Sequence, residues 1–541
     1  FITIITNSLI FSYGLYLYLY IFKEKLSKYN IYEIPIFGII ILSFISLLIN
    51  FFFPINKLVG SIILILGLIF LIIHIFKNKL ILIKFFKLII ISSLITTVLL
   101  SYSHIYRPDG GLYHLPFISI INENKIIFGL TNIHFRFGHT SIIQYLSALQ
   151  NNYFFNIASL LIPIASIFSF SILYIIKKIF ETSQKKSFFS IFCLFIAISC
   201  IISYGSFGNY GNDAAPNIYF FLLIIFFLQY LSDIKQKDSE FFKILFISIF
   251  LFTTKAFMSL ALLFPIIIFI LKKNKIKIFK NISVYLSFII IISWLLKSII
   301  ISGCLIFPIK ESCLSNLKYH DVKQTVAESS AGEAWAKDWV NQKDVKLNYK
   351  EYNKEFKWLK TWSNNHLLKI SEKLLPLLIF IILFTIYYFF KNKNKYKISK
   401  GFGYILLMSF VLSMIWFLKF PLYRYGSSFL IIFIISLSMF FMNYFGILPK
   451  KDKIKKNFNV ILIIFVFGFI SKNFLRIHEN MNILKFDVWP DIYSEDNSGV
   501  ENKFSQKKKS NTILYYYSNG KLCMYSKSPC SNYNVKNLNK K

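Results

Sequence analysis

Long apolar segments recur along the whole chain and limit it to a membrane fold. They lie near 4–22, 35–53, 58–76, 86–104, 155–176, 187–204, 214–232, 241–254, 256–271, 282–302, 372–390, 402–418, 427–446 and 458–472. About 20 apolar residues in a helix cross a hydrocarbon layer of ~30 Å. The pattern therefore predicts an all-α polytopic membrane protein with about fourteen transmembrane helices. Segments 241–254, 256–271 and 458–472 are short for a full crossing, which leaves the count uncertain by about two.

The composition agrees with this class. The 541 residues are 56% hydrophobic and 19% aromatic, and the mean hydropathy is +0.57. These values exclude a water-soluble core. The formal net charge is +36, but the lysines lie in short loops and not on one folded basic face, which argues against a nucleic-acid partner. The chain starts at Phe1 with no cleavable signal followed by a small-residue site, so we expect the first segment to remain as a span.

Lysines gather in every second connection between the apolar segments. These connections contain Lys177 and Lys178, Lys185 and Lys186, Lys272 to Lys277, Lys391 to Lys395, and Lys450 to Lys456. Lys and Arg concentrate in the cytoplasmic loops of membrane proteins, so we expect these connections to face the cytoplasm. The intervening connections, 102–154, 205–213, 254–256, 303–371, 418–426 and 473–541, are then external.

Two external pieces are large enough to fold on the membrane domain. Residues 303–371 contain Trp335, Trp339, Trp358 and Trp362 among helix-favouring stretches, which predicts a small helical insertion. The polar tail 473–541 predicts a small cap with a strand around 512–518. We therefore expect a membrane domain over 1–472, which includes the external loops 102–154 and 303–371, and an external C-terminal tail over 473–541.

The cysteines test the predicted orientation. Cys304 and Cys313 form one closely spaced pair and Cys523 and Cys530 another, both in segments assigned to the outside. An oxidising compartment favours a disulfide in each pair. Free thiols and a zinc site shared by the two pairs are the alternatives. Cys193 and Cys200 fall inside one apolar segment and read as small buried residues.

Polar groups concentrate in the first external loop. The stretch 107–116 contains Asp109, Tyr113 and His114, and the stretch 132–138 contains Arg136. Further polar motifs occur at later external positions, namely Asp213 to Pro216, Thr254 with Lys255, and Pro421 to Tyr425 around Arg424. An ionisable residue at the hydrocarbon edge is a candidate functional residue, and Asp109 is the first of these.

In the order of these motifs the chain resembles the GT-C superfamily of integral membrane glycosyltransferases. The resemblance implies that Asp109 is the catalytic base and that the donor is a sugar on a polyprenyl phosphate. It also implies inversion at the anomeric carbon, on the outer face of a bacterial plasma membrane. Many members have two neighbouring acids where this chain has 108–111, Pro-Asp-Gly-Gly. The cofactor therefore stays unknown, with a divalent metal as an open alternative.

The residues suit this chemistry. A carboxylate within hydrogen-bond reach can deprotonate an acceptor hydroxyl, which is the role expected of Asp109. The leaving phosphate needs cationic contacts, and Lys255, Arg424 and Arg136 are external or interfacial cations. Asp213, if functional, would orient the acceptor or a metal. The sugar-binding candidates are His114 and the aromatic rings of Tyr113, Trp335 and Trp339.

Each candidate also has a purely structural alternative. Asp109 and Asp213 each stand where a carboxylate caps a helix. Lys255 reads equally well as a lysine that reaches the headgroups, and Arg424 as part of an interfacial belt. The alternative roles of the other residues are hydrogen bonding at the interface for His114, His134 and His139, membrane anchoring for Trp335 and Trp339, and solvation for Glu328 and Glu333.

The sequence therefore predicts a membrane glycosyltransferase with a polyprenyl-phosphate sugar as donor and a lipid-linked glycan or another envelope molecule as acceptor. Membrane lipids are its other partners. A transporter or flippase of lipid-linked oligosaccharide is the alternative from a different class, and it would need ionisable residues within the spans. A ligase of surface polysaccharide would want arginines in its large external loop, and 303–371 contains none.

Overall fold

The computed structural model describes most of the chain. The described residues are 1–26, 30–75, 79–103, 108–182, 187–232, 236–272, 276–342, 346–389, 400–447, 451–490, 492, 506–510, 513–518 and 521–532. Helices dominate this part of the chain, and the described strands are confined to the C-terminal tail. The predicted all-α class is confirmed at this level.

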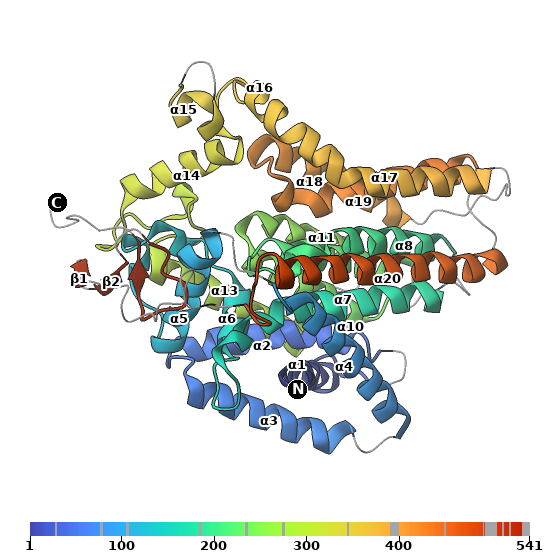
Figure 1. Ribbon diagram of the computed structural model, residues 1–541, viewed down its shortest axis with the longest axis horizontal. Helices are drawn as coiled ribbons and strands as arrows, with labels where there is room; N and C mark the ends of the chain where they lie inside the picture. The colour runs from blue at the N-terminus through green and yellow to red at the C-terminus, as the bar shows by residue number, and fades with distance from the viewer. Residues whose placement is uncertain are drawn as a thin grey trace.

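Each of the fourteen predicted segments contains a helix. The long helices are α1 (Ile2–Tyr16, continued as a π-helix over Leu17–Ile21), α2 (Ile34–Asn50), α3 (Lys57–Ile75), α4 (Lys79–Leu100), α7 (Ile162–Thr182), α8 (Ser187–Ile202), α9 (Ala214–Ser232), α10 (Asp238–Thr254), α11 (Leu263–Leu271, after the 3-10 helix Ala256–Leu262), α13 (Ile282–Ser302), α17 (Leu368–Phe389), α18 (Lys400–Lys419), α19 (Tyr423–Tyr444) and α20 (Lys451–Asn482). Most of them run side by side as one bundle (Figure 1). Of the described helical segments, nine are long and apolar enough to cross a membrane.

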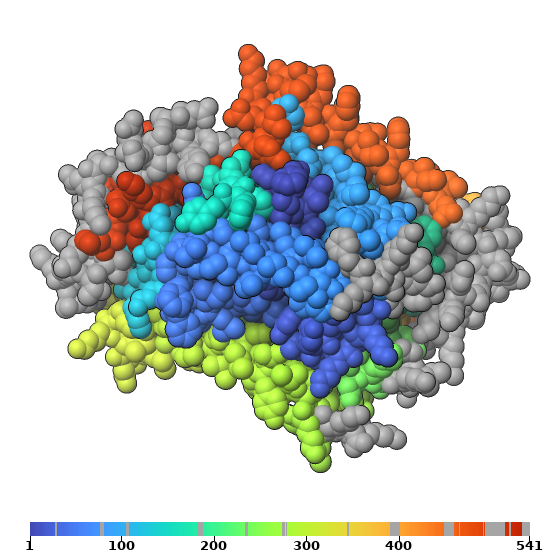
Figure 2. Space-filling model, turned by 90° about the horizontal axis from the view of Figure 1, so that it is seen from below, coloured from blue at the N-terminus to red at the C-terminus, as the bar shows by residue number. Residues whose placement is uncertain are grey.

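The bundle exposes apolar side chains on its outer helices. The inner helices α7 and α9 bury 89% and 83% of their spanning residues, whereas α3 buries 39%. Exposed residues on α3 include Ile62, Leu66, Ile69 and Ile73. Figure 2 shows α3 and α4, in mid blue, spread over one face of the molecule. Large aliphatic side chains in such numbers match a lipid surface, and the fold is that of a membrane protein.

Shorter elements gather at one end of the bundle (Figure 1). They include α5 (Leu115–Glu123), α6 (Ile142–Ala148), α14 (Val322–Ala336), α15 (Tyr349–Tyr352) and α16 (Leu359–Trp362). The tail contributes β1 (Gln506–Ser510), β2 (Ile513–Tyr517) and β3 (Cys530–Ser531), with β1 and β2 antiparallel and β2 and β3 parallel. The strand expected over 512–518 is β2, and residue 512 lies outside the described residues.

The tail docks on the first loop. The amide of Met524 donates to the carbonyl oxygen of Gly111 at 2.8 Å, and the hydroxyl of Tyr525 donates to Asn122 Oδ1 at 3.1 Å. The Cys304–Cys313 and Cys523–Cys530 disulfides are both formed, and Cys193 and Cys200 are buried thiols. The predicted pairings are therefore confirmed, and each disulfide closes a segment at this end of the bundle.

The helical insertion packs on the bundle through two of its tryptophans. The indole N–H of Trp362 donates to the carbonyl oxygen of Pro421 at 2.8 Å, and the rings of Trp358 and Trp362 contact Phe417. These contacts join the segment 303–371 to the connection between α18 and α19. The insertion is therefore fixed to the helix ends that carry the polar motifs.

Two glycines let α1 and α2 approach closely. A Cβ built at Gly14 would overlap the carbonyl group of Ile34, and one at Gly38 would overlap the carbonyl group of Ile10. Both obstacles are backbone atoms, which cannot rotate away as a side chain can. The two helices therefore depend on glycine at these positions for their separation.

We expect Gly38→Ala to destabilise the protein by about 1–3 kcal/mol, because the added methyl group forces α1 and α2 apart. The melting temperature of the detergent-solubilised protein measures the effect. Gly403→Ala in α18 is the matched control, since a Cβ there would meet no atom within 4 Å. An equal melting temperature for Gly38→Ala and Gly403→Ala would contradict the close approach.

Candidate active site at one end of the bundle

Five charged side chains from distant parts of the sequence meet at the end of the bundle that carries the short elements. Arg136 Nη1 lies 3.1 Å from Asp109 Oδ1, and Arg424 Nη2 lies 3.6 Å from Asp109 Oδ2. Arg424 Nε lies 3.3 Å from Asp213 Oδ2, and Lys255 Nζ pairs with Asp213 Oδ1. We call these five residues the charged cluster. It contains every charged residue that the sequence nominated.

Asp109 enters the cluster from the start of a π-helix over Gly110–His114. Its side chain makes no cap hydrogen bond to that helix and instead faces Arg136 and Arg424. About a quarter of the side chain is exposed, at 25%. The Gly111 position is tight, because a Cβ there would collide with the Met524 sulfur of the docked tail. The side chain of Asp109 is thus partly accessible to solvent, on a loop that the tail contacts at Gly111.

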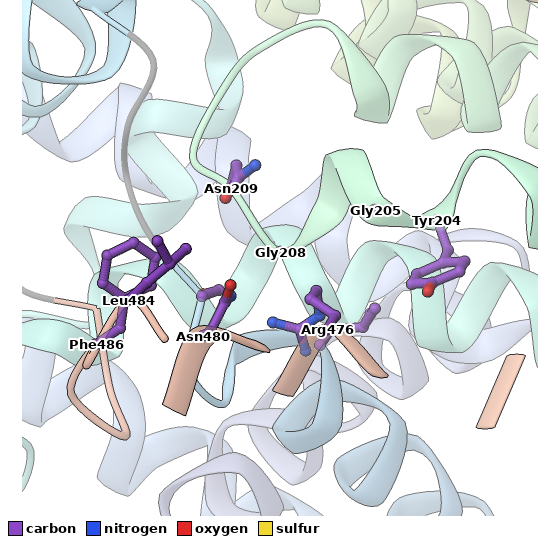
Figure 3. A pocket seen from close by; sticks show the side chains of 10 residues that line it. Tyr204, Gly205, Gly208, Asn209, Arg476, Asn480, Leu484 and Phe486 are labelled. Carbon is purple, nitrogen blue, oxygen red and sulfur yellow. The ribbon is translucent and has the colours of Figure 1, made fainter. Parts of the chain in front are cut away.

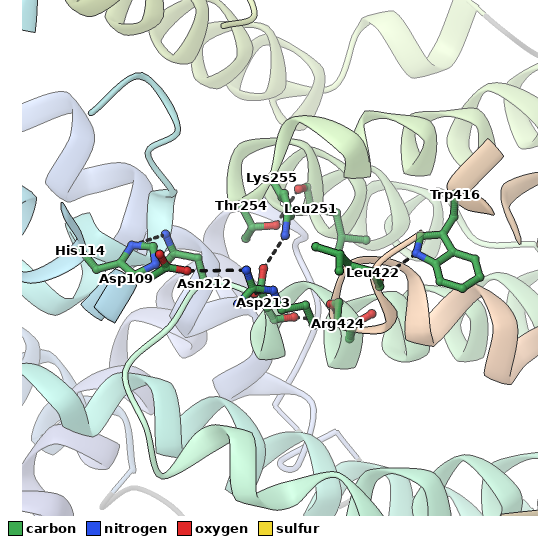
Figure 4. Close-up of polar contacts among 11 residues, drawn as sticks. Asp109, His114, Asn212, Asp213, Leu251, Thr254, Lys255, Trp416, Leu422 and Arg424 are labelled. Carbon is green, nitrogen blue, oxygen red and sulfur yellow. Dashed lines mark hydrogen bonds and ion pairs between the residues drawn. The ribbon is translucent and has the colours of Figure 1, made fainter. Parts of the chain in front are cut away.

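Asp213 precedes α9 and connects the ends of three helices. Its carboxylate pairs with Lys255, which follows α10, and with Arg424 in the first turn of α19. The amide of Asn217, one turn into α9, donates to the backbone carbonyls of Asp213 at 2.8 Å and Arg424 at 2.9 Å. Figure 4 shows Asp213, Lys255 and Arg424 pointing toward one another. Asn217 is a contact that sequence reasoning missed, although it stands four residues after Asp213 on the same helix face.

The cations fix the ionisation of Asp213. Burial acts to raise the pKa of its carboxyl, but the ammonium of Lys255 and the guanidinium of Arg424 together hold that pKa below its usual value. Asp213 is therefore ionised near neutral pH. A carboxylate so firmly paired orients its cations rather than taking up a proton.

Aromatic rings cover the cations of the cluster. Lys255 Nζ lies 3.3 Å from the centroid of the Tyr425 ring, and the Arg424 guanidinium lies 5.2 Å from the same centroid. The Arg136 guanidinium lies 5.3 Å from the Tyr113 ring, and burial raises the pKa of that phenol. Trp335 from α14 lies over Arg424 at 5.7 Å. Of the three aromatic rings expected to bind sugar, those of Tyr113 and Trp335 thus lie against cations of the cluster. Trp339 instead donates its indole N–H to the carbonyl oxygen of Leu347 at 2.7 Å.

The histidines near the cluster are neutral. Burial lowers the pKa of His114 to about 4, that of His134 to about 3 and that of His139 to about 4. His114 Nδ1 faces the side-chain amides of Asn212, at 3.1 Å, and Gln144, at 3.4 Å. His134 Nδ1 accepts from the amide of Arg136 at 3.1 Å. Hydrogen bonding is therefore the role that the contacts of His114 and His134 support.

Metal-ligand spacing does not occur at the charged cluster. Within the described part of the chain, the side chains that approach such spacing are Cys304, Cys313 and His320, and both of those cysteines are in a disulfide.

Two buried polar atoms, one in the charged cluster and one beside it, lack a hydrogen-bond partner within the described residues. They are Arg136 Nε and Asn212 Oδ1. Buried polar groups in folded proteins nearly always have a hydrogen-bond partner, so these two atoms indicate a place where a ligand or water binds. One is a donor and the other an acceptor, which suits a ligand with both phosphate and hydroxyl groups. Asn212 was missed from the sequence, although it is the neighbour of Asp213.

Two acidic residues of α14 differ from their expected role. Both were expected to be solvated. Glu328 is half-buried, and burial raises the pKa of its carboxyl although the charge of Arg136 acts to lower it. Glu333 pairs with Lys337 at 2.6 Å and with Lys419 at 3.5 Å. The solvated interpretation was therefore wrong for both, because α14 packs against the end of the bundle.

The fold and this cluster define a class, a helical membrane protein with a cluster of paired acidic and basic side chains at one end of its bundle. The chain belongs to the family described as "Domain of unknown function (DUF8201)", whose model matches residues 1–431. The matched region contains all five residues of the charged cluster and ends before the tail. No curated protein and no solved structure matches the chain.

We expect Asp213→Asn to lower stability by about 2 kcal/mol at neutral pH, because it leaves two partly buried cations short of a counter-charge. The pKa of Asp213 is lower in the folded state, so its contribution is complete above the ordinary carboxyl pKa of about 4 and is lost as the pH falls further. The melting temperatures of wild type and Asp213→Asn between pH 3 and pH 8 measure this contribution of Asp213 to stability.

The gap between wild type and Asp213→Asn should therefore be wide at pH 7 and close toward pH 3. Glu351→Gln is the control, since Glu351 is exposed on α15 and should leave the melting temperature unchanged at every pH. A gap that stays constant with pH would show that the Asp213 pairs do not stabilise the fold.

Proposed function

We propose that this protein is an inverting GT-C-type glycosyltransferase that moves a sugar from a polyprenyl-phosphate donor to a lipid-linked glycan or another envelope acceptor. The observation that carries the proposal is the charged cluster, in which one reachable carboxylate lies among three cations at the end of a membrane bundle. Such a site combines a proton acceptor with a binding place for phosphate, and the proposed reaction needs both.

The balance of charge favours an anionic substrate. Three cations of the cluster face two carboxylates, and Arg136 Nε has no partner among the described residues. A phosphate group would complete this balance. Arginine suits it especially, because the guanidinium offers two parallel N–H donors to two phosphate oxygens. Arg424 and Arg136 are therefore the proposed phosphate ligands, with Lys255 as a nearby charge.

The two carboxylates take different roles in this proposal. Asp213 is held by Lys255 and Arg424, so it positions the cations. Asp109 is the more exposed of the two, and its contact with Arg424 is the longest ion pair of the cluster, at 3.6 Å. Donor phosphate would take over that contact. Asp109 would then accept the proton of the acceptor hydroxyl as the oxygen attacks the anomeric carbon.

The orientation of the chain supports chemistry on the outer face. Disulfides persist in oxidising compartments outside the cytoplasm. The Cys304–Cys313 pair follows α13, and the Cys523–Cys530 pair belongs to the tail that docks on the first loop, so both accompany the charged cluster. The alternating lysines give the same orientation. We propose the plasma membrane of a bacterium as its location. We also propose fourteen spans, namely the nine helices that are long and apolar enough to cross a membrane together with α2, α8, α10, α17 and the Ala256–Leu271 segment.

A flippase or transporter of lipid-linked oligosaccharide is the second candidate, and one observation favours it. Lys243 in α10 is 1% exposed and pairs with Glu24 at 3.0 Å, Glu33 at 2.6 Å and Glu240 at 2.8 Å. Ionisable groups buried among membrane helices often belong to ion or substrate pathways. This buried group is the kind of feature that a transporter requires and that the sequence alone did not reveal.

Activity with a panel of purified polyprenyl-phosphate sugars tests the proposal. Asp109→Asn should reduce kcat by about a hundred-fold to ten thousand-fold, because it removes the base but keeps the shape of the side chain. The control is Glu311→Gln, which alters an exposed acid near the Cys304–Cys313 disulfide and should keep full activity. Equal turnover by Asp109→Asn and wild type would reject the base. Lipid movement across vesicles without sugar transfer would favour the flippase.

Arg424→Lys should raise the KM for the donor by about ten-fold or more, because lysine keeps the charge but loses the paired N–H donors. The effect on kcat should be smaller, since Asp109 is unchanged. Lys419→Arg is the matched control, because Lys419 is largely exposed and pairs with Glu333 outside the cluster. An unchanged donor KM in Arg424→Lys would remove Arg424 from the phosphate site.

A further inference from the structure

A cavity of about 410 Å³ lies beside the loop 203–213, which precedes α9. Its walls come from the end of α4, from the loop 203–213 and from the end of α20 (Figure 3). Polar groups in the lining include Arg476, Asn480 and Asn209, and apolar ones include Leu99, Leu484 and Phe486. None of the five residues of the charged cluster lines it. The volume lies within the range of small-ligand sites.

The cavity carries a positive charge without a counter-ion. Arg476 donates to the carbonyl oxygens of Val98 at 2.8 Å and Ser101 at 3.0 Å, and more weakly to Asn473 Oδ1 at 3.4 Å. No carboxylate of the described residues lies within 4.0 Å of Arg476. Lys472, one turn earlier on α20, lies over the Tyr204 ring at 5.4 Å. These contacts are all to neutral groups, so the cavity favours an anion.

The cavity also adjoins the lipid surface. The spanning part of α20, Asn459–Asn482, buries 6% of its residues in the protein. Phe467, Phe474 and Leu475 on this helix are all more than 60% exposed, and acyl chains are the surroundings that suit them. Arg476 follows these residues at the end of the apolar stretch, at the depth of the headgroups. An occupant would therefore have its charged part at Arg476 and its apolar part along α20.

Small residues keep the cavity open. Gly208 packs against α4, because a Cβ there would lie 2.8 Å from the carbonyl oxygen of Leu99. Gly205 also lines the cavity, and a Cβ there would meet no atom within 4 Å. Both glycines belong to the loop that ends at Asn212 and Asp213. A molecule in the cavity consequently contacts the same loop that ends at Asp213 of the charged cluster.

We infer that this cavity binds the headgroup of one anionic phospholipid, whose phosphate contacts Arg476, and that the bound lipid braces the loop 203–213. The inference goes beyond the proposed function and does not rest on it, since a transporter with the same charged cluster would have the same lipid site. It assigns to Arg476 a role as a lipid ligand in addition to its bonds to α4.

Native mass spectrometry of the full-length protein in detergent, titrated with phosphatidylglycerol, tests the inference. Wild type should bind one tightly held phosphatidylglycerol. Gly205→Leu should weaken this binding by about ten-fold, equivalent to ~1.4 kcal/mol, because its side chain competes with the headgroup for space. Gly468→Leu is the matched control, since a Cβ at Gly468 on α20 also meets no atom within 4 Å and Gly468 does not line the cavity. It should bind the lipid as wild type does.

Arg476→Gln is a second variant, and it is informative if its melting temperature equals that of wild type. Its affinity for phosphatidylglycerol should also fall by about ten-fold. Equal affinity in wild type and Gly205→Leu would overturn the inference, as would equal binding of phosphatidylcholine and phosphatidylglycerol. Inorganic phosphate that displaces the lipid at the same concentration would assign the cavity to free phosphate. Displacement by polyprenyl phosphate alone would assign it to the sugar donor. Either displacement would also overturn the phospholipid assignment.

Discussion

The bridge that Asp213 makes between Lys255 and Arg424 is the contact on which the site depends. Both cations stand at helix ends beside the hydrocarbon layer, where an unpaired charge costs several kcal/mol. Since one carboxylate pairs with both cations, the first residues of α9 and α19 and the last residues of α10 must lie together. Asn217 adds neutral hydrogen bonds to the same junction. Asp109 and Arg136 then complete the cluster from the first loop, through the contacts of Asp109 with Arg136 and Arg424.

A shared face of the membrane could be predicted for these residues, because lysines in alternate connections order the loops. Lysines in alternate connections assign 102–154, 205–213, 254–256 and 418–426 to one side of the membrane, so Asp109 and Arg424 were expected on the same face despite their distance in sequence. The helices were equally predictable, since an apolar run in a bilayer must satisfy its own backbone. The number of membrane crossings could not be predicted in the same way. A segment such as α10, with 17 residues, is long enough for a helix buried within the protein but short for a helix that crosses the membrane.

The pairings and supports escaped prediction for a physical reason. Met524 reaches Gly111 through a backbone amide and carbonyl, so no side-chain pattern marks this contact between the tail and the first loop. Glu328 approaches Arg136 only because α14 folds over the bundle, and a charged helix reads equally well as solvated. Asn212 was overlooked because the charged side chain of its neighbour Asp213 was considered instead. In each case the missing information was tertiary packing, which neither periodicity nor charge parity encodes.

The arrangement of charge along α10 bears on whether the site is fixed or moving. Lys243 and Lys255 stand twelve residues apart on this segment, which corresponds to about 18 Å along a helix axis. Lys243 is bound to three carboxylates and to the hydroxyl of Tyr18, and Lys255 is bound to Asp213. A helix that slid or rocked during transport would have to separate one of these groups, and breaking a buried pair costs about 3–5 kcal/mol. Lys243 is thus a buried ionic group of the kind that a transporter uses, but ionic contacts at both ends of α10 oppose the movement of this helix and favour a rigid scaffold. A rigid scaffold suits an enzyme, whose base and phosphate ligands must stay in register through the reaction.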